Sequence, residues 1–99
     1  MLAAACRFDL RIPGVRSLKE KRHVVKSLTA SLRSRFNVSV AEVDHHDLWQ
    51  RTAVGVAVVA PDGHQLRRIV HEVGRHVASF PGVESIEATT AYFSPEDER

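Results

Sequence analysis

In the first twelve residues every even position from Leu2 to Ile12 is apolar, while the odd positions Arg7, Asp9 and Arg11 carry charge. A period of two places alternate side chains on opposite faces of a β-strand. A proline–glycine pair then breaks the pattern. Residues 2–12 are therefore predicted to form a strand with one buried face.

Two later stretches repeat their apolar residues with the period of about 3.6 that is typical of an amphipathic helix. The first stretch, residues 17–35, has its apolar line at Leu18, Val25, Leu28 and Leu32. The second, residues 64–80, has its apolar line at Leu66, Ile69, Val70, Val73, Val77 and Phe80. Ser17 and Asp62 are typical N-cap residues, and each is followed three positions later by a residue that completes a capping box. Both helices are predicted to begin at these caps.

Three further strands are predicted at residues 38–43, 49–60 and 83–93, where β-branched and alternating residues recur. A change of phase near Ala41 indicates a bulge in the first of them. In the second, valines at alternate positions face the core, and the residues that face away are Trp49, Arg51, Ala53, Gly55 and Ala57. The first two of these strands are expected to pair as a hairpin.

The predicted element order is βαββαβ, which is the split βαβ arrangement of the ferredoxin-like α+β fold. Two right-handed crossovers would lay both helices on one face of a four-stranded antiparallel sheet and leave the other face open. Residues 1–93 are expected to form this single domain, and residues 94–99 a short, acidic, frayed tail.

Basic residues form a second line beside the apolar line of each predicted helix. The formal net charge is only +2, with a pI of about 9.1, so the placement of the charges says more than their sum. Such stripes favour a polyanionic partner over a small-molecule substrate. We predict a non-enzymatic protein that binds structured RNA or a ribosomal subunit through phosphate contacts. The predicted contact residues are Lys19, Lys21, Arg22, Lys26, Arg33, Arg68 and Arg75.

The single cysteine, Cys6, excludes an internal disulfide and lies among alternating apolar residues, where a buried thiol is expected. No apolar run approaches the roughly 18 residues of a membrane span. We therefore expect a cytoplasmic protein without a membrane contact. No cofactor motif is present, since the sequence has no Walker loop, dinucleotide fingerprint or nucleophile elbow.

Several blocks resemble the bacterial YlxP-like family along nearly the whole chain. They are Arg11-Ile12-Pro13-Gly14, residues 17–22 (SLKEKR), residues 35–43 (RFNVSVAEV) and residues 47–51 (DLWQR). The resemblance implies a small cytosolic ferredoxin-like protein with no established activity. Members are commonly encoded beside factors for transcription, translation initiation and small-subunit maturation, which implies work on RNA or the ribosome. The histidine-rich turn at His45-His46 and the extra histidines of the second helix depart from the family, so the resemblance implies no role for His23, His45, His46, His64, His71 or His76.

An alternative function uses the open face of the predicted sheet. Its central strand offers alanine and glycine where an RNA-recognition module would place stacking aromatic rings. A flat surface of small residues fits a protein partner or a second copy of the chain instead. The predicted interface is Trp49, Arg51, Ala53, Gly55 and Ala57, and a homodimer at micromolar concentration is the expected form.

A remote alternative is an acylphosphatase-like hydrolase, because such enzymes are small βαββαβ proteins that use an arginine in the first loop and an asparagine. Here Arg16 follows the first predicted strand and Asn37 opens the second. The glycine-bracketed loop that would gather amides on an anion is missing, and Pro13 removes one donor. A metal site is not expected, since adjacent side chains in the 44–47 turn diverge and no two histidines of the second helix lie three or four apart.

Overall fold

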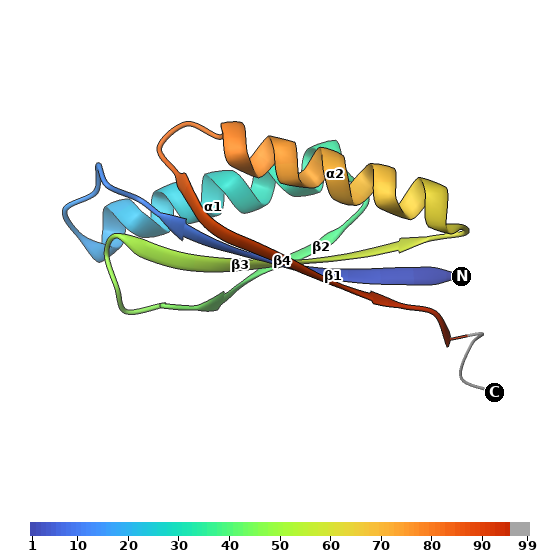
Figure 1. The fold of residues 1–99 in the computed structure, drawn as a ribbon. Helices are drawn as coiled ribbons and strands as arrows, with labels where there is room; N and C mark the ends of the chain where they lie inside the picture. Colours follow the sequence, from blue (N-terminus) through green and yellow to red (C-terminus); the bar gives the residue numbers. More distant parts are fainter. Residues whose placement is uncertain (96–99) are drawn as a thin grey trace.

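Four strands and two helices follow one another in the order βαββαβ (Figure 1). The computed structural model describes residues 1–95. Its elements are β1 (Leu2–Arg11), α1 (Leu18–Arg35), β2 (Ser39–Asp44), β3 (Arg51–Ala60), α2 (Gly63–Ser79) and β4 (Glu84–Phe93). The sheet order is β2-β3-β1-β4, with every neighbouring pair antiparallel. The predicted ferredoxin-like α+β fold is confirmed; within the predicted acidic tail, residues 96–99 lie outside the described part of the chain.

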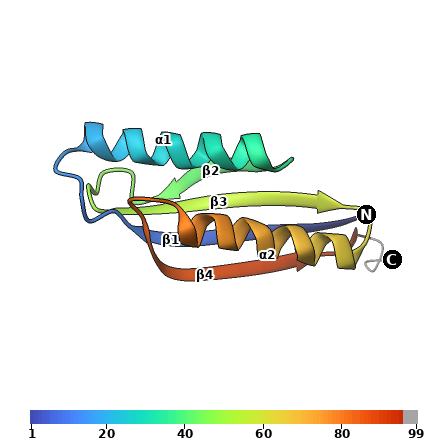
Figure 2. The same cartoon turned by 90° about the horizontal axis from the view of Figure 1, so that it is seen from above.

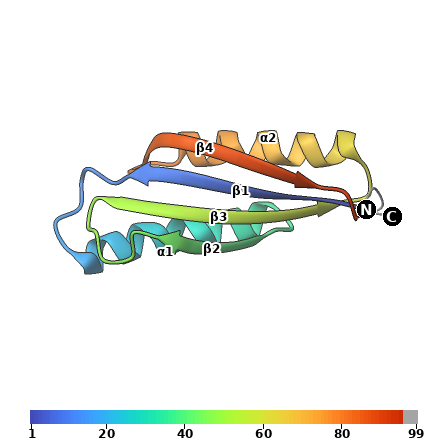
Figure 3. The same ribbon diagram turned by 60° about the horizontal axis from the view of Figure 1, so that its bottom comes forward.

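Both helices lie on the same face of the sheet and run antiparallel to each other (Figure 2). The two helices overlap along only part of their length, because the C-terminal end of α1 lies beside the C-terminal half of α2. The opposite face of the sheet carries no helix (Figure 3). The molecule therefore has a helical face and an open sheet face, as the sequence predicts.

The local sequence sets where each helix begins. The Ser17 hydroxyl accepts a hydrogen bond from the Glu20 amide at 3.1 Å, and the Glu20 carboxylate accepts one from the Arg16 amide at 2.5 Å. At the start of α2 the Asp62 carboxylate accepts from the Gln65 amide at 2.8 Å. These bonds satisfy amides that have no partner within the helix, and they confirm both predicted N-caps.

The core lies between the helices and the covered face of the sheet. Even-numbered residues of β1 and β3 meet one side of each helix there. In this core the side chains of Leu10, Leu28, Leu32, Val54, Val73 and Val77 have no exposed surface. Each contributes about 1.5 to 3 kcal/mol through the apolar surface it removes from water.

Two predicted details are wrong. Strand β3 begins at Arg51 rather than at residue 49, so Trp49 lies in the preceding loop. The bulge of β2 falls between Glu42 and Asp44 rather than near Ala41. Strand β4, for which no buried face was predicted, is exposed at all ten residues, and α2 packs more closely against β1 and β3 than against this edge strand.

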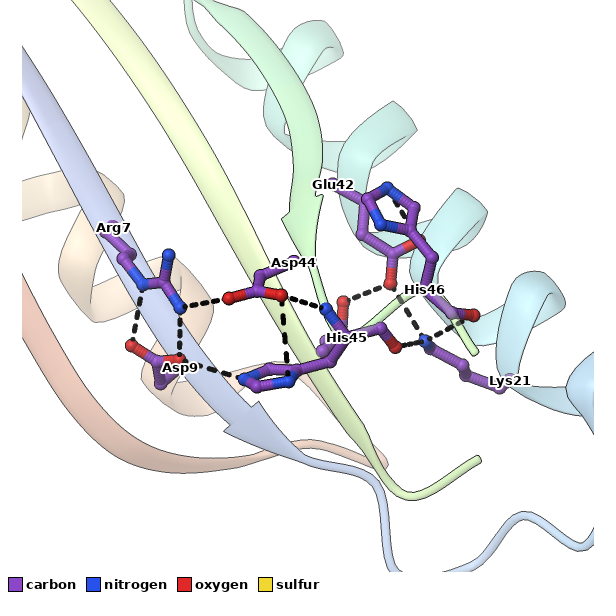
Figure 4. Close-up of polar contacts among 8 residues, drawn as sticks. Arg7, Asp9, Lys21, Glu42, Asp44, His45 and His46 are labelled. Carbon is purple, nitrogen blue, oxygen red and sulfur yellow. Dashed lines mark hydrogen bonds and ion pairs between the residues drawn. The ribbon is translucent and has the colours of Figure 1, made fainter. Parts of the chain in front are cut away.

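A further correction concerns Lys21, which was predicted to join the basic surface. Its side chain is 1% exposed, and its ammonium group lies 3.0 Å from a Glu42 carboxylate oxygen. The same ammonium donates to the His45 carbonyl at 2.5 Å and to the His46 carbonyl at 3.2 Å (Figure 4). All three donors are used inside the protein, so Lys21 presents no charge to a partner.

Glu42 completes this buried cluster. Its carboxylate also accepts a 2.5 Å hydrogen bond from the hydroxyl of Thr52, which is fully buried on β3. Burial raises the pKa of Glu42, but the hydrogen bonds from Thr52 and Lys21 outweigh it, and the pKa lies below its usual value. The Lys21 cluster, defined as Lys21, Glu42 and Thr52, thus ties α1 to β2, to β3 and to the loop between them.

We predict that Lys21→Met lowers the free energy of unfolding by about 3 kcal/mol, because it leaves the Glu42 carboxylate and two loop carbonyls without their donor. Urea denaturation at neutral pH measures this. The double variant Lys21→Met with Glu42→Leu should lose less than the single one, since no charge then remains unpaired. A single variant as stable as the wild type would contradict the structural role of Lys21.

Candidate nucleic-acid interface

The basic residues of α1 form one line along the helix. Lys19, Lys26 and Arg33 are seven positions apart, so at about 100° per residue they share a direction, and Arg22 falls within about 20° of Arg33. Arg33 donates a 2.7 Å hydrogen bond to the Val40 carbonyl of β2, which fixes that direction. The β2-side stripe, Lys19, Arg22, Lys26 and Arg33, is exposed throughout and runs beside the edge strand β2.

The basic residues of α2 lie on a different surface. The Ser31 hydroxyl and the His76 ring form a 2.7 Å hydrogen bond, so the Ser31 flank of α1 is the one that meets α2. The side chains of Ser31 and Arg33 point in directions about 160° apart around the helix axis. Arg68 and Arg75 are exposed on α2, beyond the Ser31 flank. The single basic face predicted from sequence is therefore divided into two by α1 itself.

A cleft of about 430 Å³ lies between the end of α1 and the second half of α2. We call it the interhelical cleft, and it is lined by Arg35, Phe36, Glu72, Arg75, His76 and Ser79. Sequence analysis identified only Arg75 among these residues. Arg35 lies on the flank of α1 opposite the β2-side stripe. The sequence does not show which positions of one helix face the other, because that depends on how the two helices pack.

Basic residues far outnumber acidic ones on the two helices. The helices carry nine of the lysines and arginines but only two acids, Glu20 and Glu72. Even without the buried Lys21, the exposed helical surface is strongly cationic. A cationic surface of this kind attracts polyanions by long-range electrostatics.

The open sheet face has a polar half and an apolar half. Arg7 on β1 donates to Asp9 at 3.0 and 3.1 Å and reaches across β3 to Asp44 on β2 at 3.2 Å (Figure 4). Asp9 and Asp44 are the two cross-strand neighbours of Ala53. We call these contacts of Arg7 with Asp9 and Asp44 the Arg7 bridge. The bridge passes over β3 at Ala53, which is fully buried.

The predicted sheet interface is corrected accordingly. Ala53 has no exposed surface, and Gly55 is partly covered because Val43 lies so close that an added Cβ would be 2.9 Å from its Cγ1. The small side chain of Ala53 leaves room for the Arg7 bridge, and the lack of a side chain at Gly55 leaves room for Val43. Arg51 is partly buried, while Ala57 remains exposed on the sheet and Trp49 is 51% exposed in the loop.

The apolar half lies at the other end of the sheet, where the strand register aligns two rows of residues across β3, β1 and β4. We call this the apolar patch, and it comprises Val59, Ala3, Phe93, Ala57, Ala5 and Ala91. Val59 is 62% exposed and Phe93 54% exposed. Sequence analysis identified only Ala57 of this patch, because the pairing of β4 with β1 could not be placed to the residue.

The residues proposed for an acylphosphatase-like site do not meet. Arg16 precedes α1 and Asn37 follows it, so the length of an 18-residue helix, about 27 Å, separates them. Within residues 1–95 no group of three or more histidine, cysteine, aspartate or glutamate side chains could hold a metal ion. Cys6 is buried on β1, and burial raises the pKa of its thiol.

The fold and the surface together define a small α+β domain with a cationic helical face and an open sheet. A family model described as "Protein of unknown function (DUF503)" matches residues 3–90. The chain is also 38% identical over 77 residues to the "Uncharacterized protein YlxP" of Bacillus subtilis (strain 168), covering 78% of this chain and 84% of that protein. The chain belongs to the DUF503 family, and the resemblance to YlxP-like proteins is confirmed.

Solved structures with a similar arrangement have low sequence identity. The de novo designed protein Foldit4 has a TM-score of 0.50 at 14% identity, with 93% of this chain and 97% of that chain covered. A mutant of SnoaB, a cofactor-independent oxygenase from Streptomyces nogalater, has a TM-score of 0.46 at 12% identity, with 94% and 90% covered. The first likeness supports the fold alone. Among the helices of residues 1–95, none is both long and apolar enough to span a membrane.

The Arg7 bridge should make stability depend on pH in acid. The hydrogen bonds from Arg7 lower the pKa of Asp9, and those from the His45 amide and Arg7 lower the pKa of Asp44. Both carboxyls thus bind protons less readily when folded, so their contribution is present above the ordinary aspartate pKa, about 3.9, and is lost as the pH falls through the folded values.

We predict that Arg7→Gln destabilises the protein more at pH 6 than at pH 2, because the two aspartates take up protons as the pH falls through their lowered pKa values and the wild type then loses the bridge too. Urea denaturation at the two pH values measures the difference. Asp47→Asn, at an exposed loop position, is the control and should show no such pH-dependent gap. An equal loss at both pH values would contradict the role given to Arg7.

Proposed function

We propose that this chain is a non-enzymatic cytoplasmic accessory protein that binds structured RNA or a ribosomal subunit through the β2-side stripe. The observation that carries the proposal is a line of exposed cations from Lys19 to Arg33, about 21 Å long, on a helix whose only acid is Glu20. That length matches several successive phosphates of a folded RNA.

Recognition of backbone and shape fits this surface better than the reading of bases. RNA modules that read single strands stack bases on aromatic residues in the middle of a sheet. Here the central strands present Gly55, Ala57 and the Arg7 bridge on the open face. Trp49 lies outside the sheet, in the β2–β3 loop. Phosphate contacts supply affinity and orientation without base specificity.

Reversing charge at Lys19 and Lys26 together should weaken RNA binding about tenfold or more and lower the log–log salt slope by about two units, one for each lost phosphate contact. Both side chains are exposed and off the buried line through Val25 and Leu28, so the fold should survive. Fluorescence anisotropy with a labelled RNA hairpin at several salt concentrations measures both quantities.

The matched control compares single variants. Lys26→Glu and Arg11→Glu change the net charge equally, but Arg11 is an exposed residue at the end of β1, outside the helical surface. Only Lys26→Glu should reduce binding and slope. Trp49→Ala should leave both nearly unchanged, whereas a stacking role would make it at least as damaging. Equal effects of the two charge reversals would defeat the proposal.

Self-association through the apolar patch is a second candidate function. The observation that favours it is the exposure of two large apolar side chains, Val59 and Phe93, next to the alanines of the same two rows. Exposed apolar patches on a protein surface commonly mark an interface. A second copy could pack its own flat patch against this one about a two-fold axis.

The wild-type protein should be dimeric at micromolar concentration, and Val59→Asp should make it monomeric by placing a charge within the contact. Light scattering over a range of concentrations measures the mass. Leu48→Asp is the matched control, because Leu48 is 50% exposed in the β2–β3 loop, away from the patch. A wild-type monomer at every concentration would rule out this second candidate.

A further inference from the structure

Two guanidinium groups from different helices line the interhelical cleft. Arg35 comes from the last turn of α1 and Arg75 from the second half of α2. Within residues 1–95 neither side chain has an ion pair or a hydrogen-bond partner. The one acid in the cleft wall, Glu72, lies 3.9 Å from Arg68. Arginines of this kind are free to take a ligand, and the guanidinium fork matches the oxygens of a phosphate.

The charge balance of the cleft favours an anion. Both helices end near it, and their C-termini contribute about half a negative charge each. The charge of Glu72 is offset by Arg68, which lies 3.9 Å away outside the cleft wall, while Arg35 and Arg75 add two positive charges. The sum is about one positive charge, concentrated between Arg35 and Arg75. Neutralising the partial negative charge at the helix C-termini would require less positive charge than the cleft contains.

His76 also lines the cleft, and three contacts fix its ring. The hydrogen bond to Ser31 holds one ring nitrogen, Phe36 packs edge-on at 5.9 Å between centroids, and Phe80 packs at 6.0 Å. Burial and the positive charge of Arg35 lower the pKa of His76. The imidazole is therefore neutral near pH 7. A bound anion nearby would raise the pKa of His76, so this pKa can be used to detect anion binding.

We propose that the interhelical cleft binds one phosphate group, held by Arg35 and Arg75. On the proposed function, on which this part of the inference rests, the phosphate belongs to the RNA backbone, so that one RNA molecule contacts both the β2-side stripe and the cleft on the other flank of α1. A free phosphate monoester is the other source with the same chemistry.

Titration of the His76 imidazole by NMR, with inorganic phosphate at constant ionic strength, tests the cleft directly. Phosphate should raise the pKa of His76, because it places negative charge among the groups that face the ring, namely Arg35, Glu72 and Arg75. Arg35→Gln and Arg75→Gln should each weaken phosphate binding about tenfold or more. Arg67→Gln is the matched control, since Arg67 is exposed on the far flank of α2, and it should bind phosphate as the wild type does.

A His76 pKa that phosphate leaves unchanged, or binding that survives in both cleft variants, overturns the inference. Circular dichroism confirms that each variant is folded; the two independent substitutions keep the test decisive if one of them is not. The NMR readout needs no RNA, so it separates the cleft from the proposed function.

Competition identifies the source of the phosphate. An RNA hairpin that displaces phosphate from the wild-type cleft, and that binds more weakly to Arg75→Gln than to Arg67→Gln, supports the RNA assignment. Phosphate binding that RNA does not displace overturns that assignment and leaves the cleft as a site for a small phosphate monoester. Loss of RNA binding in Lys26→Glu together with an inert cleft overturns only the cleft.

Discussion

The buried ammonium group of Lys21 is the constraint on which the rest of the polar architecture depends. A charge with 1% exposure is tolerated only when its hydrogen bonds are satisfied, and here a carboxylate and two backbone carbonyls do so. The partners come from β2 and from the loop that follows it. Because Lys21 is fixed on α1, the loop is held against the first turn of that helix. This position in turn places Asp44 and His45 over the sheet, where Asp44 accepts a hydrogen bond from Arg7 and the His45 ring lies 3.7 Å from Asp9.

The Arg7 bridge explains the composition of the central strands. A long side chain that crosses from β1 to β2 must pass over β3, and only small residues leave room beneath it. Ala53 and Gly55 occupy these positions. Further along the same strands no bridge exists, and there the small residues are left exposed with Val59 and Phe93. One alternating pattern of small side chains thus serves two different purposes at the two ends of the sheet.

Local signals in the sequence were sufficient for the fold. Caps at Ser17 and Asp62, the period-two strands and the apolar lines of the helices each depend on residues a few positions apart, and they were predicted correctly apart from the start of β3 and the bulge of β2. The candidate sites depend instead on contacts between distant residues. Lys21 has the same sequence neighbourhood as Lys19, and its burial is decided by Glu42 and Thr52 on other elements. No periodicity argument carries that information.

The same limit explains why one predicted basic face became two surfaces. The sequence shows the direction of a basic stripe relative to the apolar line of the same helix. Whether the stripe then lies beside a second helix or beside the edge of the sheet depends on which strand the helix covers. The bonds of Arg33 to β2 and of Ser31 to α2 decide this for α1. Pairing of two copies through the apolar patch would turn all four helices outward, since patch and helices lie on opposite faces of the sheet (Figure 3). RNA binding and self-association then use separate surfaces, so a dimer would present two stripes and two clefts to one polyanion.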